Sequence, residues 1–186
     1  MLIGFTGKKY AGKDTAGAVL GKCGFNHISF ATPMKYYVGV LLSALGYSNE
    51  DCDAYTDGAK KQEIVPELGV TPRHMLQSLG TDWGRDLINP DLWVKLLVGR
   101  VKQAPEEDFY VTDVRFHNEA DLIRASGGKV VRIVNPNTAD DCFSSHASER
   151  DIPNLATDYP DIINDSDIKT LHGKVVKMML HFDKGL

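Results

Sequence analysis

The sequence predicts an α/β fold in which a mostly parallel sheet carries helices on both faces. Short apolar runs alternate along the chain with longer segments whose apolar residues recur every three or four positions. Such alternation is typical of parallel sheets, because each crossover between strands places a helix against a face of the sheet. The length of 186 residues suits a single domain with its own core.

The expected elements follow from this patterning in chain order. Strands are predicted at residues 2–6, 26–30, 109–114, 129–134 and 159–163. Helices are predicted at residues 13–22, 32–45, 71–79, 90–102, 117–126 and 166–181. Thr32 and Thr71 each precede a proline, which marks a helix start with a threonine N-cap, and Ser166 is the expected cap of the last helix. Gly80 is expected to end the third helix, and residues 47–70 form a polar excursion with some helix.

The composition excludes several classes of protein. Hydrophobic residues make up 42% and charged residues 25%, which argues against disorder. The net charge of −4 disfavours a nucleic acid polymer or an anionic membrane as partner, so any phosphate binding must be local. No apolar run approaches the roughly eighteen residues of a membrane span, and the three cysteines, Cys23, Cys52 and Cys142, are too few and too scattered for a disulfide framework. We therefore expect a cytoplasmic protein.

The strongest local signal is a glycine-rich loop at residues 7–13, which matches the pattern G-x-x-x-x-G-K. It lies between a predicted strand and a predicted helix, which argues against a chance occurrence. In this motif the glycines let backbone N–H groups wrap a phosphate, and the lysine reaches the β- and γ-phosphates of a nucleotide. The expected ATP-binding residues are Gly7, Lys8, Ala11, Gly12, Lys13, Asp14 and Thr15.

Asp14 stands where this motif usually has a serine or threonine whose hydroxyl binds magnesium. Either Asp14 serves the metal, through a water molecule, or the hydroxyl of Thr15 does, and the sequence leaves both open. A carboxylate beside a triphosphate is repulsive without a cation, which favours a magnesium-linked role for Asp14.

Further motifs resemble those of the tailed-phage deoxynucleoside monophosphate kinases. The matching blocks are Gly12-Lys13-Asp14-Thr15, residues 73–82, residues 92–96, residues 111–115 with Glu119, residues 146–149 and residues 162–165. They occur in the order of that family and span nearly the whole chain, so the set is more specific than any one block.

The resemblance implies a P-loop nucleoside/nucleotide kinase fold with five parallel strands in the order 2-3-1-4-5. It implies that the γ-phosphoryl group of ATP, with Mg²⁺, passes to a deoxynucleoside monophosphate and gives the diphosphate and ADP. It also implies one kinase domain over residues 1–186, with a helical monophosphate-binding excursion at 47–104 and a lid-like loop at 135–150. A phage-encoded member would act in the host cytoplasm.

Asp113 and Arg115 are two residues apart at the carboxyl end of a predicted strand, where ligands bind in open α/β sheets. The acceptor oxygen of a monophosphate is already ionised near pH 7, so the reaction needs positioning and charge neutralisation more than a base. We expect Asp113 to orient magnesium and Arg115 to bind the acceptor phosphate or the transferring group. An ion pair at the strand end is the alternative. Together with Lys13, these are the predicted catalytic residues, and Asp14, Thr15 and Asp113 are the predicted metal residues.

Arg73 and Gln77 lie on one face of a predicted helix, since they are four residues apart. An arginine can bind a phosphate bidentately and a glutamine can read a base edge, whereas the alternative is a solvated helix face. The further acceptor candidates are Lys35, Arg85, Trp93, Asn118 and Glu119. Of these, Trp93 either stacks on a base or fills the core, and Glu119 either binds substrate or caps the next helix.

A lid is expected to close over the triphosphate, since ATP would hydrolyse if water were not excluded. Its candidate residues are Arg132, His146 and Arg150, although a histidine in the position of His146 is more often a hydrogen-bonding residue at a helix start. The sequence leaves open whether the protein forms a homodimer.

Two other functions also stay open. A dephospho-coenzyme A kinase-like enzyme would share Lys13 and Asp113 but would not need Gln77 for a base. An ATP-binding regulator without turnover would account for Asp14 and for a lid with few arginines.

Overall fold

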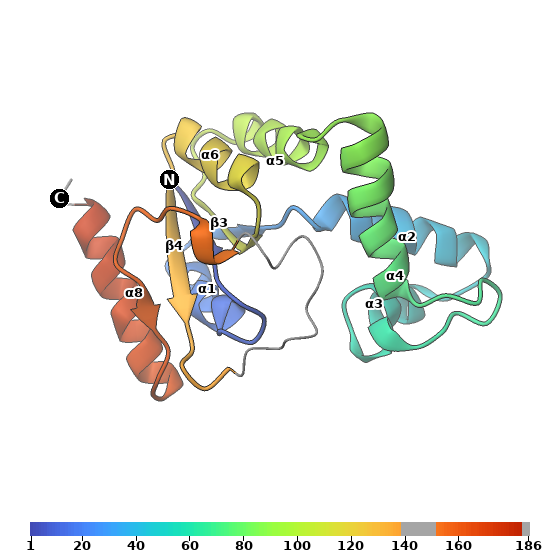
Figure 1. Cartoon of the computed structure of the whole chain (residues 1–186), viewed down its shortest axis with the longest axis horizontal. Helices are drawn as coiled ribbons and strands as arrows, with labels where there is room; N and C mark the ends of the chain where they lie inside the picture. Colours follow the sequence, from blue (N-terminus) through green and yellow to red (C-terminus); the bar gives the residue numbers. More distant parts are fainter. Residues whose placement is uncertain (139–151, 184–186) are drawn as a thin grey trace. The chain divides into compact units, whose positions relative to one another are not determined.

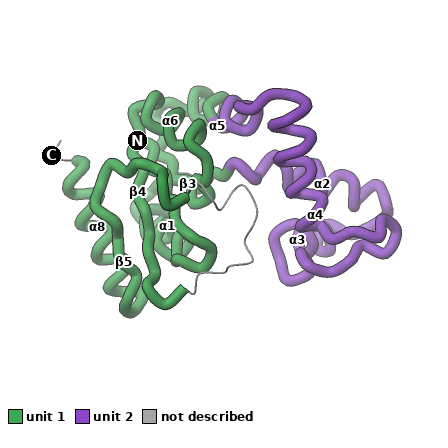
Figure 2. The backbone as a smooth tube through the Cα atoms, viewed as in Figure 1, with its two compact units in different colours: residues 1–29, 98–186 green, residues 30–97 purple. Residues whose placement is uncertain are grey.

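The computed structural model describes residues 1–138 and 152–183. The chain forms two compact units, one made of residues 1–29 and 98–186 and the other of residues 30–97 (Figure 2). The predicted excursion at 47–104 overlaps the second unit, which begins earlier, at Phe30. Helix α5 (Leu92–Gln103) spans the boundary between the two units.

The first unit contains a five-stranded parallel sheet (Figure 1). Its strands lie in the order β2-β3-β1-β4-β5, so the predicted order 2-3-1-4-5 is confirmed. The strands are β1 (Leu2–Thr6), β2 (Asn26–Ile28), β3 (Phe109–Val114), β4 (Lys129–Val134) and β5 (Ile162–Ile163). The helices that lie wholly within the described residues of this unit are α1 (Lys13–Lys22), α6 (His117–Ala125) and α8 (Ile168–Asp183), together with the short 3-10 turn η3 (Ile152–Asn154).

Strand β1 is buried on both faces, because side chains that alternate along it meet helices on opposite sides of the sheet. Ile3 and Phe5 belong to a core that includes residues of α1 and α8, such as Leu20 and Met178. Gly4 faces the other side, where a Cβ atom would lie 2.5 Å from Cδ1 of Ile123 in α6. The helices therefore cover both faces of the sheet, as predicted.

The second unit is helical around a core of its own. Its elements are α2 (Thr32–Ala44), α3 (Asn49–Thr56), the 3-10 helix η1 (Ala59–Gln62), α4 (Pro72–Ser78), the π-helical segment η2 (Leu79–Ile88) and the beginning of α5. The core consists of Val38, Leu42, Cys52, Tyr55 and Val65.

The expectation that a helix ends at Gly80 is wrong, because α4 continues directly into η2. A Cβ atom on Gly80 would lie 2.7 Å from the sulfur of Met34, and one on Gly84 would overlap the indole of Trp93. These glycines are thus required for close packing inside the unit. Sequence patterning cannot distinguish a glycine that ends a helix from one that lets a neighbouring side chain approach.

Other boundaries differ by a few residues. Strand β2 ends at Ile28, before the predicted end at residue 30, and β5 is confined to Ile162–Ile163. Thr71 caps α4 as predicted, accepting a hydrogen bond of 3.2 Å from the His74 N–H. The predicted cap of the last helix, Ser166, is wrong, because Asp167 caps α8. The carboxylate of Asp167 accepts a hydrogen bond of 2.7 Å from the N–H of Thr170, three residues further along the chain.

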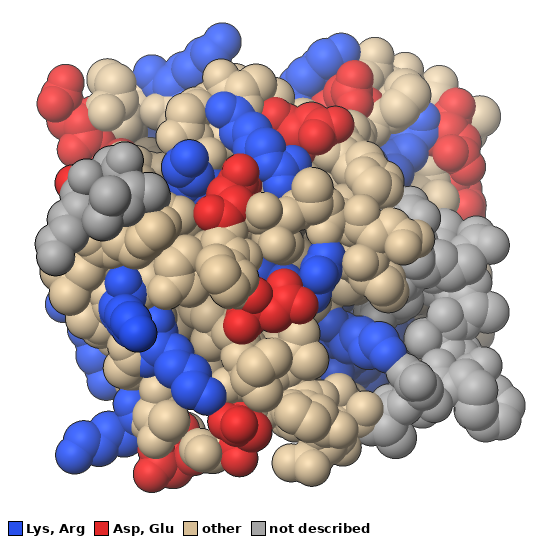
Figure 3. Space-filling view, turned by 60° about the vertical axis from the view of Figure 1, so that its left-hand side comes forward, with Lys and Arg blue, Asp and Glu red and all other residues tan. Residues whose placement is uncertain are grey.

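Charged side chains of both signs are interspersed on the face drawn in Figure 3, in keeping with the small net charge. Within the described ranges, no helix combines the length and the apolar character that crossing a membrane requires.

The start of α6 depends on a buried carboxylate. Glu119 is 2% exposed and accepts hydrogen bonds from the backbone N–H groups of Arg115 at 2.7 Å and Phe116 at 3.1 Å. We expect Glu119→Ala to lower the free energy of unfolding by about 2 kcal/mol, since two partly buried N–H donors lose their acceptor. Urea unfolding measures the change. Glu106→Ala, at an exposed glutamate, is the control and should stay within about 0.5 kcal/mol of the parent. Equal effects of the two substitutions would contradict the capping role.

Candidate functional site

The loop between β1 and α1 takes a backbone path that needs glycine at both ends. Gly7 has a φ of 143° and Gly12 a φ of 97°, values at which a side chain is strained. A Cβ atom on Gly7 would overlap the carbonyl oxygen of Ile133 in β4. Tyr10, with a φ of 63°, is a non-glycine residue with left-handed backbone at the tip of this loop. The loop and the amino end of α1 form the predicted phosphate site.

The Lys13 ammonium group lies across the loop from which it emerges. Its Nζ donates to the carbonyl oxygens of Gly7 and Lys8, each at 2.8 Å. The positive charge is thereby held at the loop, where the positive end of the α1 dipole adds to it. Both features favour an anion there.

Asp14 is held by a side chain from the neighbouring strand. The hydroxyl of Thr112 in β3 donates to Oδ1 of Asp14 at 2.5 Å, and Nε2 of His27 lies 3.3 Å from the same hydroxyl oxygen. Because a threonine has one hydroxyl proton, which goes to Asp14, Nε2 of His27 must donate. Burial, and secondly the Asp14 carboxylate, raises the pKa of Tyr110, whose ring lies 4.9 Å from that of His27. The chain of contacts fixes one carboxylate oxygen of Asp14.

Thr15, the alternative metal residue, lies in the first turn of α1. Its carbonyl oxygen lies 2.9 Å from Nε2 of His172 in α8, a contact that joins the two helices. No contact in the described part of the chain involves its hydroxyl.

Asp113 lies at the carboxyl end of β3, and the Ser29 hydroxyl donates to its Oδ2 at 2.7 Å. Arg115 does not share the strand with it, because β3 ends at Val114. Arg115 lies in the turn before α6, where its N–H donates to Glu119. The alternation of side chains along a strand therefore does not determine whether Arg115 points to the same side as Asp113.

The buried position of Glu119 supports its alternative role as a helix cap. Asn118 precedes it in the first turn of α6, partly exposed.

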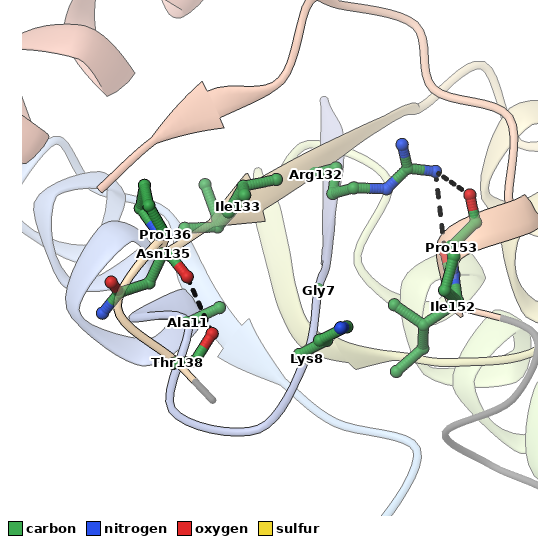
Figure 4. Close-up of a pocket in the computed structure, with 11 residues that line it drawn as sticks. Gly7, Lys8, Ala11, Arg132, Ile133, Asn135, Pro136, Thr138, Ile152 and Pro153 are labelled. Carbon is green, nitrogen blue, oxygen red and sulfur yellow. Dashed lines mark hydrogen bonds between the residues drawn. The ribbon is translucent and has the colours of Figure 1, made fainter. Parts of the chain in front are cut away.

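A cavity of about 390 Å³ adjoins the phosphate loop in the first unit (Figure 4). It is lined by Gly7, Lys8 and Ala11 of the loop, by residues 132–136 and 138, and by Ile152 and Pro153. Arg132 donates to the carbonyl oxygens of Pro153 at 3.2 Å and of Leu155, and forms an ion pair of 3.4 Å with Asp161. These bonds tie β4 to the segment before β5. The other two lid candidates, His146 and Arg150, lie outside the described residues, as do most of residues 135–150 and Cys142.

The remaining acceptor candidates belong to the second unit. Arg73 and Gln77 are half-buried on α4, and within the described ranges neither makes a hydrogen bond or ion pair. Lys35 forms an ion pair of 2.6 Å with Asp57, and Arg85 donates to the carbonyl oxygen of Pro90 at 3.2 Å.

Trp93 fills the core of its own unit. It is 1% exposed, and its indole N–H donates to the carbonyl oxygen of Gly80 at 2.8 Å. The interpretation of Trp93 as a stacking platform for a base is therefore wrong, because both the ring and its polar atom are occupied within the unit.

The donor set fits magnesium. This ion is usually held by one or two carboxylates together with substrate phosphates and water, and Asp14 and Asp113 flank the sheet edge next to the loop. Among the described residues, no group of three or more histidine, cysteine or carboxylate side chains could hold a metal without a substrate.

Sequence reasoning missed the residues that orient the site. Thr112 and His27 hold Asp14, Ser29 contacts Asp113, and Asn164 contacts the loop itself. The sequence did contain a signal for Asn164, since residues 162–165 form one of the blocks that match the kinase family. Its contact, however, is with Ala11, which lies 153 positions away in the chain.

Comparison with known proteins identifies relatives over the whole length of the chain. Residues 49–175 match the family model described as deoxynucleotide monophosphate kinase. A protein of Acanthamoeba polyphaga mimivirus whose name places it among deoxynucleotide monophosphate kinases is 30% identical over 191 residues, covering 95% of this chain and 94% of the relative.

Two phage enzymes match over part of their length. The deoxynucleoside-5'-monophosphate kinase of Escherichia phage T5 is 32% identical across 50% of this chain, and the match spans 39% of that enzyme. The deoxynucleotide monophosphate kinase of Escherichia phage RB69 is 31% identical across 75% of this chain, and the match spans 57% of that enzyme.

The fold is shared with a solved structure of low sequence similarity. A dephospho-CoA kinase from Campylobacter jejuni superposes with a TM-score of 0.54 at 16% identity, covering 99% of this chain and 98% of the other. At that identity the likeness shows the fold alone, which is that of a P-loop kinase.

The Thr112 hydroxyl can be tested as the group that orients Asp14. We expect Thr112→Val to weaken the binding of ATP in the presence of magnesium about fivefold, with little effect on ATP binding in its absence, because Asp14 loses its donor. Calorimetry with and without magnesium measures both affinities. Thr6→Val is a matched control, since Thr6 is also a buried strand threonine, but its hydroxyl has no partner among the described residues. An equal loss in both variants would contradict the assignment.

Proposed function

The chain belongs to the deoxynucleotide monophosphate kinase family, and we propose that it transfers the γ-phosphoryl group of ATP to a deoxynucleoside monophosphate, giving the diphosphate and ADP. The observation that carries the proposal is the glycine loop, with the Lys13 ammonium held across it at the start of α1. A loop of this kind binds the phosphates of a nucleoside triphosphate. Family membership supports the deoxynucleotide as acceptor.

The donor phosphates bind to the loop residues between Gly7 and Thr15. Backbone N–H groups supply hydrogen bonds, and Lys13 neutralises charge on the β- and γ-phosphates. Lys8, which lines the cavity beside the loop, adds a second positive charge there. This arrangement favours the transition state, in which charge spreads over the transferring oxygens.

Asp14 and Asp113 are the residues that would hold magnesium, directly or through water. When bound, magnesium would supply neutralisation of the negative charge on the phosphates of ATP. The part played by the protein is orientation: Thr112 fixes one oxygen of Asp14, and Ser29 fixes one oxygen of Asp113. The other oxygen of Asp14 makes no hydrogen bond to a described residue, which suits a contact with the ion.

Candidate acceptor residues are assigned in each unit by itself. In the first unit, Arg115 and Asn118 lie beyond the carboxyl end of β3, where ligands bind in open α/β sheets, and this supports a role with the phosphate that receives the transferred group. Arg73 and Gln77 are four residues apart on α4, and we assign the first to the monophosphate and the second to the base or sugar. Lys35 and Arg85 supply further positive charge. No base catalyst is required, because the acceptor oxygen is already ionised.

Family membership favours this acceptor over dephospho-coenzyme A, since the likeness to a dephospho-CoA kinase is confined to the fold. An ATP-binding regulator without turnover is also less favoured, because the matching family and the phage relatives are named as kinases. We further propose that the protein works in the cytoplasm, where ATP, magnesium and deoxynucleoside monophosphates are available.

The acceptor assay tests the function directly. With MgATP, we expect formation of ADP and a deoxynucleoside diphosphate from at least one of the four common deoxynucleoside monophosphates, and no product from dephospho-coenzyme A. Lys13→Ala should lower turnover at least about a hundredfold, because the transferring group loses its cation. Lys22→Ala, at the exposed end of α1, is the control and should match the parent. ATP binding without ADP formation on any acceptor would favour a regulator.

Kinetic constants of Arg73 variants test whether Arg73 binds the monophosphate or ATP. We expect Arg73→Ala to raise the KM for the monophosphate at least about tenfold and to leave the KM for ATP within about twofold. Arg73→Lys keeps the charge but loses the bidentate geometry, so it should recover only part of the loss. His74→Ala, at the neighbouring exposed position, is the control. An unchanged KM for the acceptor in Arg73→Ala would place the acceptor elsewhere.

A further inference from the structure

Asn164 contacts the phosphate loop from a distant part of the chain. It follows β5, and its side-chain amide donates from Nδ2 to the carbonyl oxygen of Ala11 at 3.0 Å. Ala11 is 1% exposed, so this carbonyl oxygen depends on protein for its hydrogen bond. We propose that Asn164 is a positioning residue that aims the backbone of the phosphate loop at the donor phosphates, an inference that rests on ATP being the donor.

The direction of a carbonyl group fixes the direction of the next N–H group. A peptide bond is planar and trans, so the Ala11 carbonyl and the Gly12 N–H point in opposite directions. When Asn164 holds the carbonyl, the Gly12 N–H points away from Asn164. Gly12 is the N-cap of α1, where loop amides converge on a phosphate. Asn164 therefore fixes the direction of the Gly12 N–H, which would donate to a phosphate, without itself touching the phosphate.

Packing around Gly12 supports the same role. A Cβ atom on Gly12 would lie 2.5 Å from Nδ2 of Asn164 and 3.7 Å from Cδ2 of Leu171 in α8. The asparagine thus forms the wall against which the loop rests. The carbonyl oxygen of Gly12 accepts from the Ala16 N–H at 2.8 Å, which begins α1. The carbonyl groups on both sides of the Gly12 N–H are thus held by protein, and this N–H itself makes no hydrogen bond to a described residue.

The position of Asn164 is itself braced. Its N–H donates to the carbonyl oxygen of Val134 at 2.7 Å, which extends the pairing of β4 with β5. On either side, Lys174 donates to the carbonyl oxygen of Ile163 at 2.6 Å and to Asp165 at 2.9 Å. A rigid support makes the contact with Ala11 able to orient the loop. The acceptor is a carbonyl oxygen, so an asparagine amide suits this position and an aspartate does not.

The test compares two substitutions at Asn164 with one at its neighbour. Calorimetry measures the affinity of each variant for MgATP and for inorganic tripolyphosphate, which carries phosphates without a base. We expect Asn164→Ala to weaken the binding of both ligands about tenfold, as loss of one partly buried hydrogen bond implies. Asn164→Asp should weaken them further, because it sets a carboxylate against a carbonyl oxygen. Asp165→Asn is the control, since the new amide oxygen can still accept from Lys174 and the contact with the loop is untouched, and it should stay within about twofold.

A structural role alone would give a different pattern. We expect the KM for the monophosphate, measured at saturating ATP, to stay within about twofold in Asn164→Ala, because the acceptor is bound by other residues. Unchanged affinity for MgATP and tripolyphosphate in the folded variant would overturn the proposal. A rise in the acceptor KM as large as the loss of ATP affinity would also overturn it. If Asn164→Ala does not fold, Asn164→Ser is judged by the same two outcomes.

The binding assays need no acceptor, so they separate this inference from the proposed function. If the parent protein bound MgATP but phosphorylated no monophosphate, the proposed function would fail, and the comparison at Asn164 would still decide the positioning role. If the parent bound neither MgATP nor tripolyphosphate, this inference would be overturned as well.

Discussion

The close approach of the phosphate loop to the edge formed by β4 and β5 is the constraint on which the rest of this protein depends. Gly7 lies against the carbonyl oxygen of Ile133, and Gly12 lies against the amide of Asn164. No side chain fits at either point, so the two glycines of the motif are fixed by packing as well as by backbone conformation. Residues near both ends of the chain are needed to shape one loop. The carboxyl-terminal strand and helix therefore belong to the donor site as much as the loop does.

The carboxylates of the site are oriented by neutral hydroxyl groups. Thr112 donates to Asp14 and Ser29 donates to Asp113. A hydroxyl donor fixes an oxygen atom without cancelling its charge, unlike an arginine or lysine partner. The hydrogen bond from Thr112 therefore leaves the charge of Asp14 available to a cation. This fits the proposed role of Asp14 at the metal, because a carboxylate beside a triphosphate would be repulsive on its own.

The second unit supplies a different kind of surface. Its core is built from α2, α3 and Val65, and partly buried residues of α4 pack against it. Trp93 packs separately against the π-helical segment, at Gly80 and Gly84. Arg73 and Gln77 lie on α4, and neither has a partner in the described part of the chain. Polar groups held on a rigid helix lose little freedom when a ligand binds, which suits recognition of a monophosphate. The unit thus combines an apolar interior with a few convergent polar groups.

Local pattern by itself determined the alternation of strands and helices, the phosphate loop and the Thr71 cap, because each depends on residues close together in the chain. Strand order and activity came from the ordered set of family motifs. Tertiary structure alone decided that Trp93 is core, that Gly80 continues a helix, that Glu119 is a buried cap and that Asn164 supports the loop. In each case the deciding contact joins residues that a short window cannot relate, or depends on burial, which side-chain identity does not fix.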